Sequence, residues 1–332
     1  MATRQSELER IARRYASFAV DEARGASEIY ERLALAVAAS RKLLTFLAAL
    51  PVARRQPNLF FAAIRHVIGV PESAAHLAEI VGREHRRIRE VMLSRTTQTN
   101  EPARCAVLLP LLARLPEPLA LLEVGASAGL CLLPDQYGYD YGAARVELRG
   151  PDANQAPMFP CEVTGPAPLP ARVPRIACRV GLDLNPIDLN SEDETAWLET
   201  LVWPGQEERA RRLRAAIAIA RRDPPTVVQG DLLTDLAPLI ATAPRDATLV
   251  IFHTAVFPYV VPQERRNAFV ETVRNSSAVW ISNEAPGLFP DLAEKAPASP
   301  DRGRFLLAQD GIPVAWTSPH GQSMEWFSSG HG

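Results

Sequence analysis

The chain has little cysteine, and its four cysteines include no Cys-x-x-Cys pair. Closely spaced cysteine pairs are the usual signature of structural zinc sites and of disulfide frameworks, so the sequence disfavours both. We expect reduced thiols, most of them buried, at Cys105, Cys131, Cys161 and Cys178.

A charge excess of either sign is also missing. The 332 residues contain 36 Lys and Arg against 38 Asp and Glu, which gives a net charge of -2. Without a basic surplus to neutralise a phosphate backbone, nucleic acid is a poor default partner. A small-molecule substrate is the simplest expectation, and a homodimer is the commonest assembly for soluble enzymes of this size.

Long hydrophobic runs are lacking as well. The N-terminus leads straight into a charged amphipathic stretch, so a secretory signal is not evident. The longest apolar stretch, residues 33–52, is interrupted by Arg41 and Lys42 and closed by Pro51, which makes it unsuitable for crossing a bilayer. We therefore expect a cytoplasmic protein that does not contact membranes.

Hydrophobic residues make up 47% of the chain and charged residues 22%, which is typical of globular proteins. The length predicts two domains at roughly 150 residues each. Residues 1–115 predict a helical N-terminal cap domain, with apolar residues at three- and four-residue steps. One helix is expected from an N-cap at Ser27 to Pro51, another over 58–70, and a basic one after Pro71 whose arginines are balanced by glutamates.

From about residue 116 the pattern changes to short apolar runs alternating with helical stretches. Strands are predicted at 119–124, 175–184, 226–229, 248–253 and 278–283, and helices at 192–222, 232–240 and 262–275. Such alternation predicts an α/β domain over 116–332, with a mostly parallel sheet and helices on both faces.

Two segments depart from this alternation. Residues 137–174 are rich in Pro and Gly and are interpreted as an insertion, with a hairpin around Val146 and Val163. Three short apolar runs near the C-terminus, at 305–308, 314–317 and 324–327, predict closing antiparallel strands.

The sharpest local signal is a buried strand that ends in Glu123 and is followed by small residues. These are Gly125, Ala126, Ser127, Ala128 and Gly129. They predict a tight turn into a helix N-terminus, where a ligand can approach the main chain. Because small residues also occur in such turns for packing reasons alone, the motif by itself leaves a ligand role and a packing role about equal.

Two further strand ends are acidic, at Asp183 and Asp231. In an open α/β sheet, ligands bind outside the carboxyl ends of the strands. There, one carboxylate can accept both hydroxyl protons of a ribose, and the next can accept from an adenine amine. Both residues could instead be helix N-caps. Gly129 and Asp183 are 54 positions apart, against roughly 20 in the dinucleotide fingerprint, so the insertion must loop out.

These segments resemble the class I methyltransferase fold, which binds S-adenosylmethionine. More closely, the chain resembles a bacterial family described as domain of unknown function 2332. The similar phrases are Arg95-Thr-Thr-Gln-Thr-Asn-Glu101, Glu123-Val-Gly-Ala-Ser-Ala-Gly-Leu130, Arg179-Val-Gly-Leu-Asp183, Leu201-Val-Trp-Pro204 and Pro319-His-Gly321. Cys131 departs from the Asn expected in that pattern, and Pro134 also looks unusual.

The resemblance implies a Rossmann-like fold and a set of roles around the cofactor. The backbone from Gly125 to Gly129 would face its amino-acid end, and Glu123 would receive the ammonium. Asp183 would bind the ribose and Asp231 the adenine.

At the end of the fourth strand, His253 would face the methyl group, where a neutral imidazole can act as a base. A single hydrogen bond that caps a neighbouring loop explains His253 equally well. Glu284 ends the fifth strand and would orient the acceptor or form a structural ion pair. In the link before the sheet, Arg95 would clamp a carboxylate, while Asn100 is expected to cap the next helix in either case.

Two functions therefore compete. The first is a small-molecule methyltransferase with S-adenosylmethionine as cofactor and a helical cap. The second is a catalytically silent relative that keeps the fold as a binding module, which Cys131 and Pro134 favour. A hydrolase or metal enzyme that uses His253, Glu284 and His320 is weaker, because their spacing does not match that of metal ligands. The sequence identifies no metal site and no methyl acceptor.

Overall fold

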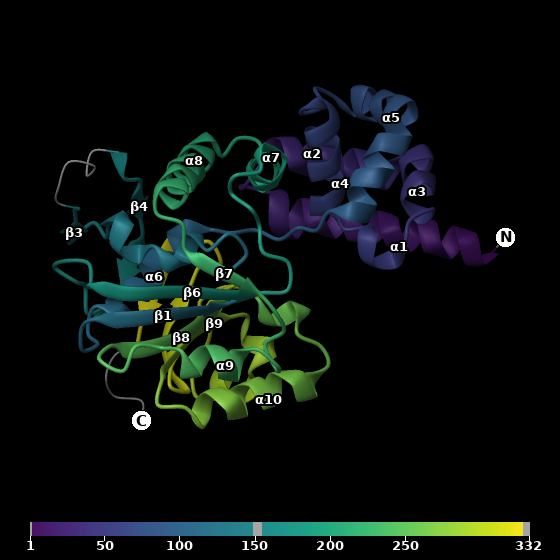
Figure 1. Ribbon diagram of the computed structural model, residues 1–332. Helices are drawn as coiled ribbons and strands as arrows, with labels where there is room; N and C mark the ends of the chain where they lie inside the picture. Colours follow the sequence, from purple (N-terminus) through teal and green to yellow (C-terminus); the bar gives the residue numbers. More distant parts are fainter. Residues whose placement is uncertain (1, 149–154, 328–332) are drawn as a thin grey trace. The chain divides into compact units, whose positions relative to one another are not determined.

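The computed structural model of the protein describes residues 2–148 and 155–327, in two compact units (Figure 1). Unit 1 holds the described residues up to Thr99 together with Ser191–Arg211. Unit 2 holds the described residues of Asn100–Asn190 and those from Arg212 onward. The boundary predicted from the sequence was 115/116, and residues 149–154 of the expected insertion lie outside the described residues.

Unit 1 is helical, as its apolar periodicity predicts. Its elements are α1 (Ala2–Phe18), η1 (Ala19–Ala23), α2 (Glu28–Ala39), α3 (Arg41–Ala48), η2 (Val52–Arg54), α4 (Pro57–Ile68), α5 (Ala74–Ser94) and α7 (Glu192–Leu201). Serine hydroxyls fix the starts of α2, α3, α5 and α7, because each accepts a hydrogen bond from a backbone N–H of the first turn. These caps are Ser27, Ser40, Ser73 and Ser191.

Two predicted helices are each divided. The helix expected from Ser27 to Pro51 breaks at Ser40, which ends α2 and caps α3. The helix expected over 192–222 breaks into α7 and α8 (Glu207–Arg222), with Pro204 and Gly205 between them. Gly205 has a φ of 90°, which a helix does not allow. Apolar periodicity alone missed both interruptions.

Aromatic side chains fill the core of unit 1. The Tyr15 ring contacts Phe60 and Phe61 edge to face at centroid distances of 6.1 and 6.0 Å. Trp197 and Leu201 of α7 belong to the same buried cluster. Because α7 buries its apolar side chains there, residues 191–211 group with the N-terminal helices rather than with the sheet that precedes them in the chain.

Unit 2 is built on a sheet. Its strands are β1 (Leu119–Val124), β2 (Gly138–Asp140), β3 (Arg145–Val146), β4 (Met158–Pro160), β5 (Glu162–Thr164), β6 (Ile176–Asp183), β7 (Thr226–Gln229), β8 (Thr248–Thr254), β9 (Val279–Glu284), β10 (Phe305–Gln309), β11 (Ile312–Thr317) and β12 (Ser323–Trp326). Within the described residues, the large sheet has the order β5-β12-β11-β10-β9-β8-β1-β6-β7. All pairings from β7 to β9 are parallel, and β9 to β12 are antiparallel.

Helices cover the parallel part of this sheet on both faces (Figure 1). The helical elements of unit 2 are η3 (Pro102–Arg104), α6 (Cys105–Leu112), η4 (Leu130–Leu132), η5 (Pro134–Gln136), α9 (Leu236–Ala241), η7 (Phe257–Tyr259), α10 (Gln263–Arg274), η8 (Pro286–Leu288) and α11 (Pro290–Ala293), and most of α8. Leu236 of α9 and Phe269 of α10 pack in one buried cluster with strand residues, while every residue of α6 is buried. The predicted α/β class with a mostly parallel sheet is confirmed.

The hairpin predicted around Val146 and Val163 is wrong. Val146 of β3 pairs with Tyr139 of β2 in a small separate sheet of order β3-β2-β4. Val163 of β5 pairs instead with Met324 of β12, at the edge of the large sheet. Strand partners depend on contacts remote in sequence, which local patterning does not reveal.

None of the helices in the described ranges is sufficiently long and apolar to cross a membrane.

Candidate functional site at the carboxyl edge of the sheet

The order of the parallel strands reverses beside β1, which lies between β6 and β8 (Figure 1). Chain connections leave such a point in opposite directions, so open α/β sheets bind ligands outside the carboxyl ends of the strands there. Glu123 lies near the end of β1 and Asp183 ends β6, with Glu123 paired in register with Gly181. The structure thus brings these two predicted residues to neighbouring strand ends.

The turn after β1 is tight, as predicted, but it does not open an α-helix. Gly125, Ser127 and Gly129 all have positive φ, at 75°, 55° and 74°. The chain then makes two short 3-10 turns, η4 and η5. A left-handed Gly129 ends any helical path, and Pro134 has no N–H to donate. The expected helix N-terminus is therefore absent from residues 125–136.

Protein side chains occupy the space beside both glycines. A Cβ on Gly125 would lie 2.2 Å from Cγ2 of Val256, and one on Gly129 would lie 2.7 Å from Cγ of Pro225. Ala126 is fully buried, and its Cβ would lie 2.5 Å from a Cβ placed on Gly181. Close packing of the chain thus accounts for the small residues of this turn.

Asp183 links the end of β6 to the turn after β1. Its Oδ2 accepts a hydrogen bond from the backbone N–H of Ser127 at 2.8 Å, and its Oδ1 accepts from that of Asn185, also at 2.8 Å. The carboxylate is half-buried. It does not cap an α-helix, because α7 is capped by Ser191. Asp183 therefore holds the two candidate ligand-binding segments together.

Asp231, which follows β7, is committed to protein contacts. Its Oδ1 accepts from the backbone N–H of Leu233 at 2.8 Å, and its Oδ2 forms an ion pair with Arg265 of α10. The Asp231 and Arg265 side chains are each about one-third exposed. An adenine amine would have to share this carboxylate with the guanidinium.

Glu123 is an unusual carboxyl group of this edge. Only 2% of the residue is exposed, and its Oε2 is buried with no hydrogen-bond partner in the described part of the chain. Burial raises its pKa well above the usual carboxyl range, and nearby Cys131 and Asp183 add to this while Arg104 opposes it. The Ser127 hydroxyl is also buried and unpaired within the described residues. Buried polar atoms without a hydrogen-bond partner are rare, so the Glu123 carboxyl and the Ser127 hydroxyl make this edge of the sheet a candidate ligand site.

The segment before η3 contacts the same turn. Asn100 was expected to cap a helix, but Glu101 does so, by accepting from the backbone N–H of Ala103 at 3.2 Å. Asn100 Oδ1 instead accepts from the N–H of Leu130 at 2.8 Å, directly after the glycine turn. Cys131 Sγ donates to the Glu101 carbonyl at 3.3 Å. A hydrogen bond with Cys105, together with burial, raises the pKa of the Cys131 thiol, so the thiol is a packing group rather than a nucleophile.

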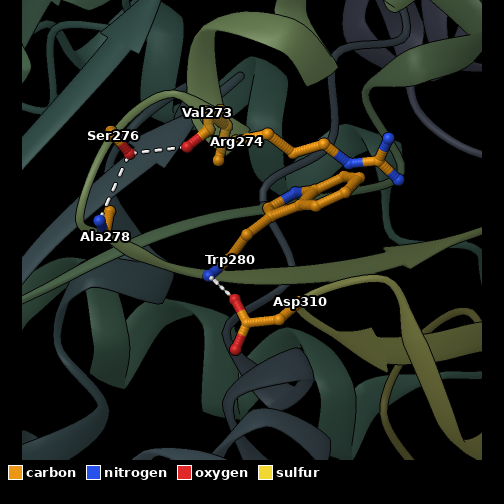
Figure 2. A pocket seen from close by; sticks show the side chains of 6 residues that line it. All are labelled: Val273, Arg274, Ser276, Ala278, Trp280 and Asp310. Atoms are coloured by element: carbon orange, nitrogen blue, oxygen red, sulfur yellow. Dashed lines mark hydrogen bonds between the residues drawn. The ribbon is translucent and has the colours of Figure 1, made fainter.

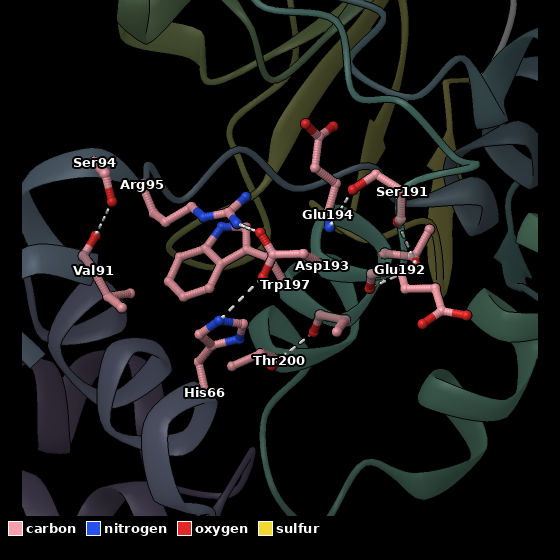
Figure 3. Close-up of polar contacts among 12 residues, drawn as sticks. His66, Val91, Ser94, Arg95, Ser191, Glu192, Asp193, Glu194, Trp197 and Thr200 are labelled. Atoms are coloured by element: carbon pink, nitrogen blue, oxygen red, sulfur yellow. Dashed lines mark hydrogen bonds and ion pairs between the residues drawn. The ribbon is translucent and has the colours of Figure 1, made fainter. Parts of the chain in front are cut away.

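Arg95 lies in unit 1 rather than with the other predicted residues. Its guanidinium forms an ion pair with Asp193 and lies 5.8 Å from the centre of the Trp197 ring (Figure 3). His66 Nε2 is 3.4 Å from the other Asp193 oxygen. Trp197 donates its indole N–H to the Thr96 carbonyl at 2.9 Å. The carboxylate that Arg95 binds in this structure is therefore a side chain of α7.

His253 and Glu284 contact each other on the face of the sheet opposite Glu123. In register, Glu123 pairs with Phe252, so the next residue, His253, points to the opposite side of the sheet. His253 is fully buried. Its Nε2 accepts from the indole N–H of Trp280 at 3.1 Å, which leaves the proton on Nδ1, 2.9 Å from Glu284 Oε1.

Both ring nitrogens of His253 are thus engaged, which favours its structural interpretation over that of a base. Glu284 Oε1 also accepts from the backbone N–H groups of Val256 and Phe257, at 3.0 and 3.4 Å. The pair therefore fixes the loop after β8, whose Val256 packs against Gly125. Ala255 in that loop has a φ of 57°, which is strained for a residue with a Cβ.

Two residues of this edge were missed from the sequence. Arg104 is 5% exposed and donates through Nε to the Pro319 carbonyl at 2.9 Å and through Nη1 to the Thr254 carbonyl at 3.2 Å. Asn283 is fully buried, and its Oδ1 accepts from the Thr317 hydroxyl at 2.7 Å. Asn283 stands next to Glu284 at a strand end, so extending the strand-end search beyond acidic residues would have found it.

A pocket of about 170 Å³ lies elsewhere, at the amino end of β9 (Figure 2). Trp280, the second residue of the strand, lines it together with Arg274 and Asp310. Asp310 Oδ1 accepts from the Trp280 backbone N–H at 2.8 Å. Because Glu284 ends the same strand, this pocket is at the opposite edge of the sheet from the candidate site.

In residues 2–148 and 155–327, no three His, Cys, Asp or Glu side chains form a group that could hold a metal ion.

Fold and site together define an α/β protein with a buried polar edge at the switch point of its sheet. Over residues 12–326 the chain matches the model of a family described as uncharacterized proteins conserved in bacteria, domain of unknown function 2332 (DUF2332). The chain belongs to this family. Neither the curated proteins nor the solved structures contain a match to it.

Proposed function

We propose that the protein is an S-adenosylmethionine-dependent methyltransferase with a Rossmann-like, class I-type fold, acting on a small molecule. The parallel strands support this proposal, because they run third, second, first, fourth and fifth in chain order, from β7 to β9. Their connections therefore diverge from β1, which is the arrangement in which a nucleoside is bound across the strand ends. Acidic residues at the ends of β1 and β6 supply the expected acceptors.

The observation on which the proposal depends is the buried, unsatisfied carboxyl of Glu123 beside a turn that Asp183 holds in place. Glu123 would receive the ammonium of the cofactor, and this charge would let the carboxyl ionise inside the protein. Asp183, whose carboxylate accepts from Ser127 and Asn185, would also accept from the ribose hydroxyls. The cofactor would supply an electrophilic methyl group on a sulfonium.

Two contacts must change for the ligand to lie along the turn. Val256 must leave the position beside Gly125, and Asp231 must share its carboxylate between Arg265 and the adenine. The strained backbone of Ala255 is in the loop that would move, and strain of this kind is concentrated in functional segments. We propose that this loop opens when the cofactor binds.

A base is not essential to the proposed reaction, because methyl transfer from a sulfonium needs mainly alignment of the reacting atoms. His253 and Glu284 would then act as positioning residues for the loop after β8. The engagement of both His253 nitrogens also favours the second candidate, a catalytically silent binding module, since it provides no proton acceptor at the predicted position. Cytoplasmic location, the small-molecule acceptor and homodimer formation stay predictions.

Calorimetric titration of the purified protein with S-adenosylhomocysteine tests the proposal. We expect saturable binding to the wild type and a loss of about tenfold or more in Asp183→Asn, because one carboxylate acceptor is removed. Asp188→Asn is the matched control: Asp188 also accepts from the backbone N–H two residues on, at 2.9 Å. Its neighbour Ile187 donates to the Ser127 carbonyl, so Asp140→Asn is the second control. Asp140 Oδ1 accepts from the backbone N–H of Gly142, also two residues on, at 2.9 Å, and Asp140 lies on β2 of the small separate sheet.

If the wild type gives neither heat nor thermal stabilisation with saturating S-adenosylmethionine or S-adenosylhomocysteine, the methyltransferase proposal fails. Binding that is equal in the wild type and Asp183→Asn would instead place the nucleoside at another site. Binding without turnover on any tested acceptor would support the silent module.

A further inference from the structure

Arg104 is a buried cation without an anionic partner. It donates only to the neutral oxygens of Pro319 and Thr254, and among the described residues it forms no ion pair. Its Nη2 group donates no hydrogen bond to a described residue but is not fully buried. A buried, uncompensated charge is strongly unfavourable, so such residues normally pair with a carboxylate.

Arg55 of unit 1 shows the usual arrangement. It is 7% exposed and donates to the carbonyls of Leu50 and Ala48, as Arg104 donates to two carbonyls. Unlike Arg104, it also forms an ion pair with Glu7 at 2.6 Å. The comparison isolates what Arg104 lacks, which is a carboxylate.

The polar groups of the edge do not supply one. Glu123 is close enough for Arg104 to lower its pKa, but burial has the larger effect and raises it, and the buried Glu123 Oε2 accepts no hydrogen bond from Arg104 or from any other described residue. Glu101 caps η3 by accepting from the Ala103 N–H, and no ion pair joins its carboxylate to Arg104 in the described residues. No carboxylate of the described chain therefore pairs directly with Arg104.

A second unpaired donor lies on the neighbouring strand, next to the threonine that holds Arg104. Asn283 pairs in register with Thr254, whose carbonyl and hydroxyl hold the Arg104 guanidinium. The Thr317 hydroxyl donates a hydrogen bond to Asn283 Oδ1, whereas the Asn283 Nδ2 group is buried with no partner in the described ranges. Because Thr254 is two residues beyond Phe252, the register partner of Glu123, all three strand residues share one face of the sheet.

We propose that Arg104 and Asn283 form a carboxylate-binding subsite on the Glu123 face of the sheet. A carboxylate accepts from a guanidinium and an amide at once, and it neutralises the buried charge. The carboxylate could come from the amino-acid end of the proposed cofactor or from the methyl acceptor. The subsite follows from these contacts alone and does not require the proposed function.

The direct test compares acetate with its neutral isostere acetamide, by thermal unfolding at equal ionic strength. We expect acetate at millimolar concentrations to raise the melting temperature of the wild type, and acetamide not to do so. Arg104→Gln should abolish this difference and Arg104→Lys should retain part of it, because lysine keeps the charge but not the fork. Arg55→Gln is the matched control and should retain the full acetate response.

Asn283→Asp keeps the shape of the side chain and places a carboxylate next to Thr254, which holds the Arg104 guanidinium. We expect this variant to melt higher than the wild type and to lose the acetate response, because the subsite is then filled from within. Equal responses to acetate and acetamide in the wild type would overturn the subsite. So would an Arg104→Gln variant that folds and still discriminates between them.

The source of the carboxylate is found by titrating S-adenosylhomocysteine and 5′-methylthioadenosine, which lacks the amino-acid group. If the cofactor supplies it, S-adenosylhomocysteine binds the wild type about 10- to 100-fold more tightly, and Arg104→Gln reduces this ratio. If the acceptor supplies it, Arg104→Gln leaves the ratio between the two nucleosides unchanged, and acetate still binds to the protein saturated with S-adenosylhomocysteine. If neither nucleoside binds but acetate still stabilises the protein more than acetamide does, the carboxylate subsite is supported and the proposed cofactor is ruled out.

Discussion

Replacing Glu123 with Gln tests whether the carboxyl at the end of β1 is neutral in the folded protein. The residue is 2% exposed, and burial raises its pKa well above the ordinary range. Below the unfolded-state pKa, about 4.3, the carboxyl is protonated in both states, so its contribution to stability is fully present. As the pH rises toward the folded-state pKa, the unfolded chain releases the proton while the native state keeps it, and this contribution is lost.

The size of the effect follows from proton linkage. Between the two pKa values the free energy of unfolding of the wild type should fall, from this group alone, by about 1.4 kcal/mol for each pH unit. Gln does not titrate, so in Glu123→Gln this slope is absent. The variant should equal the wild type to within about 1 kcal/mol near pH 4 and become progressively more stable than it above pH 5.

Urea unfolding curves at half-unit steps from pH 4 to pH 8 measure the difference between the two proteins. The pH at which the difference stops growing reports the folded-state pKa of Glu123. Glu271→Gln, at an exposed position on α10, controls for removing one carboxyl from the chain. A difference between wild type and Glu123→Gln that is constant with pH would refute the reasoning, because Glu123 would then ionise equally in the folded and unfolded states.

Three further substitutions test individual contacts. Gly125→Ala should lower the free energy of unfolding by about 2–5 kcal/mol, because residue 125 has a left-handed backbone and the new Cβ would lie 2.2 Å from Val256. Urea unfolding measures this loss, and a loss below about 1 kcal/mol would show that Val256 can move aside at little cost. Trp280→Phe leaves His253 Nε2 buried without a hydrogen-bond donor and should lower the free energy of unfolding by about 1–3 kcal/mol. An unchanged urea midpoint would contradict the hydrogen bond between Trp280 and His253. Asp193→Asn removes the ion pairs of a carboxylate that is 63% exposed, so we expect the free energy of unfolding to change by less than about 1 kcal/mol and by still less in high salt. A larger loss of stability would show that the Asp193 carboxylate does more than form surface ion pairs.

Local sequence patterns were sufficient for the strands of the parallel sheet and for most helix starts. The strands predicted at 119–124 and 226–229 coincide with β1 and β7, and the other three parallel strands match to within one residue at each end, because central strands are short apolar runs bounded by turn residues. Ser27 caps α2 as expected, because capping depends only on residues one turn apart. The acidic strand ends follow from the same patterns, whereas the strand order that makes β1 the switch point came only from the structure.

Only the tertiary structure decided how the residues of the edge are used. Whether the space beside Gly125 is open or filled depends on Val256, which lies more than a hundred residues away in the chain. The register of β8 turns His253 away from the face that bears Glu123, and Trp280 then occupies its second nitrogen. Arg104 stands out only because no carboxylate reaches it, which requires knowing all its neighbours. Strand ends are local properties, whereas burial, pairing and the charge state of a buried group depend on contacts that folding brings together from distant parts of the chain.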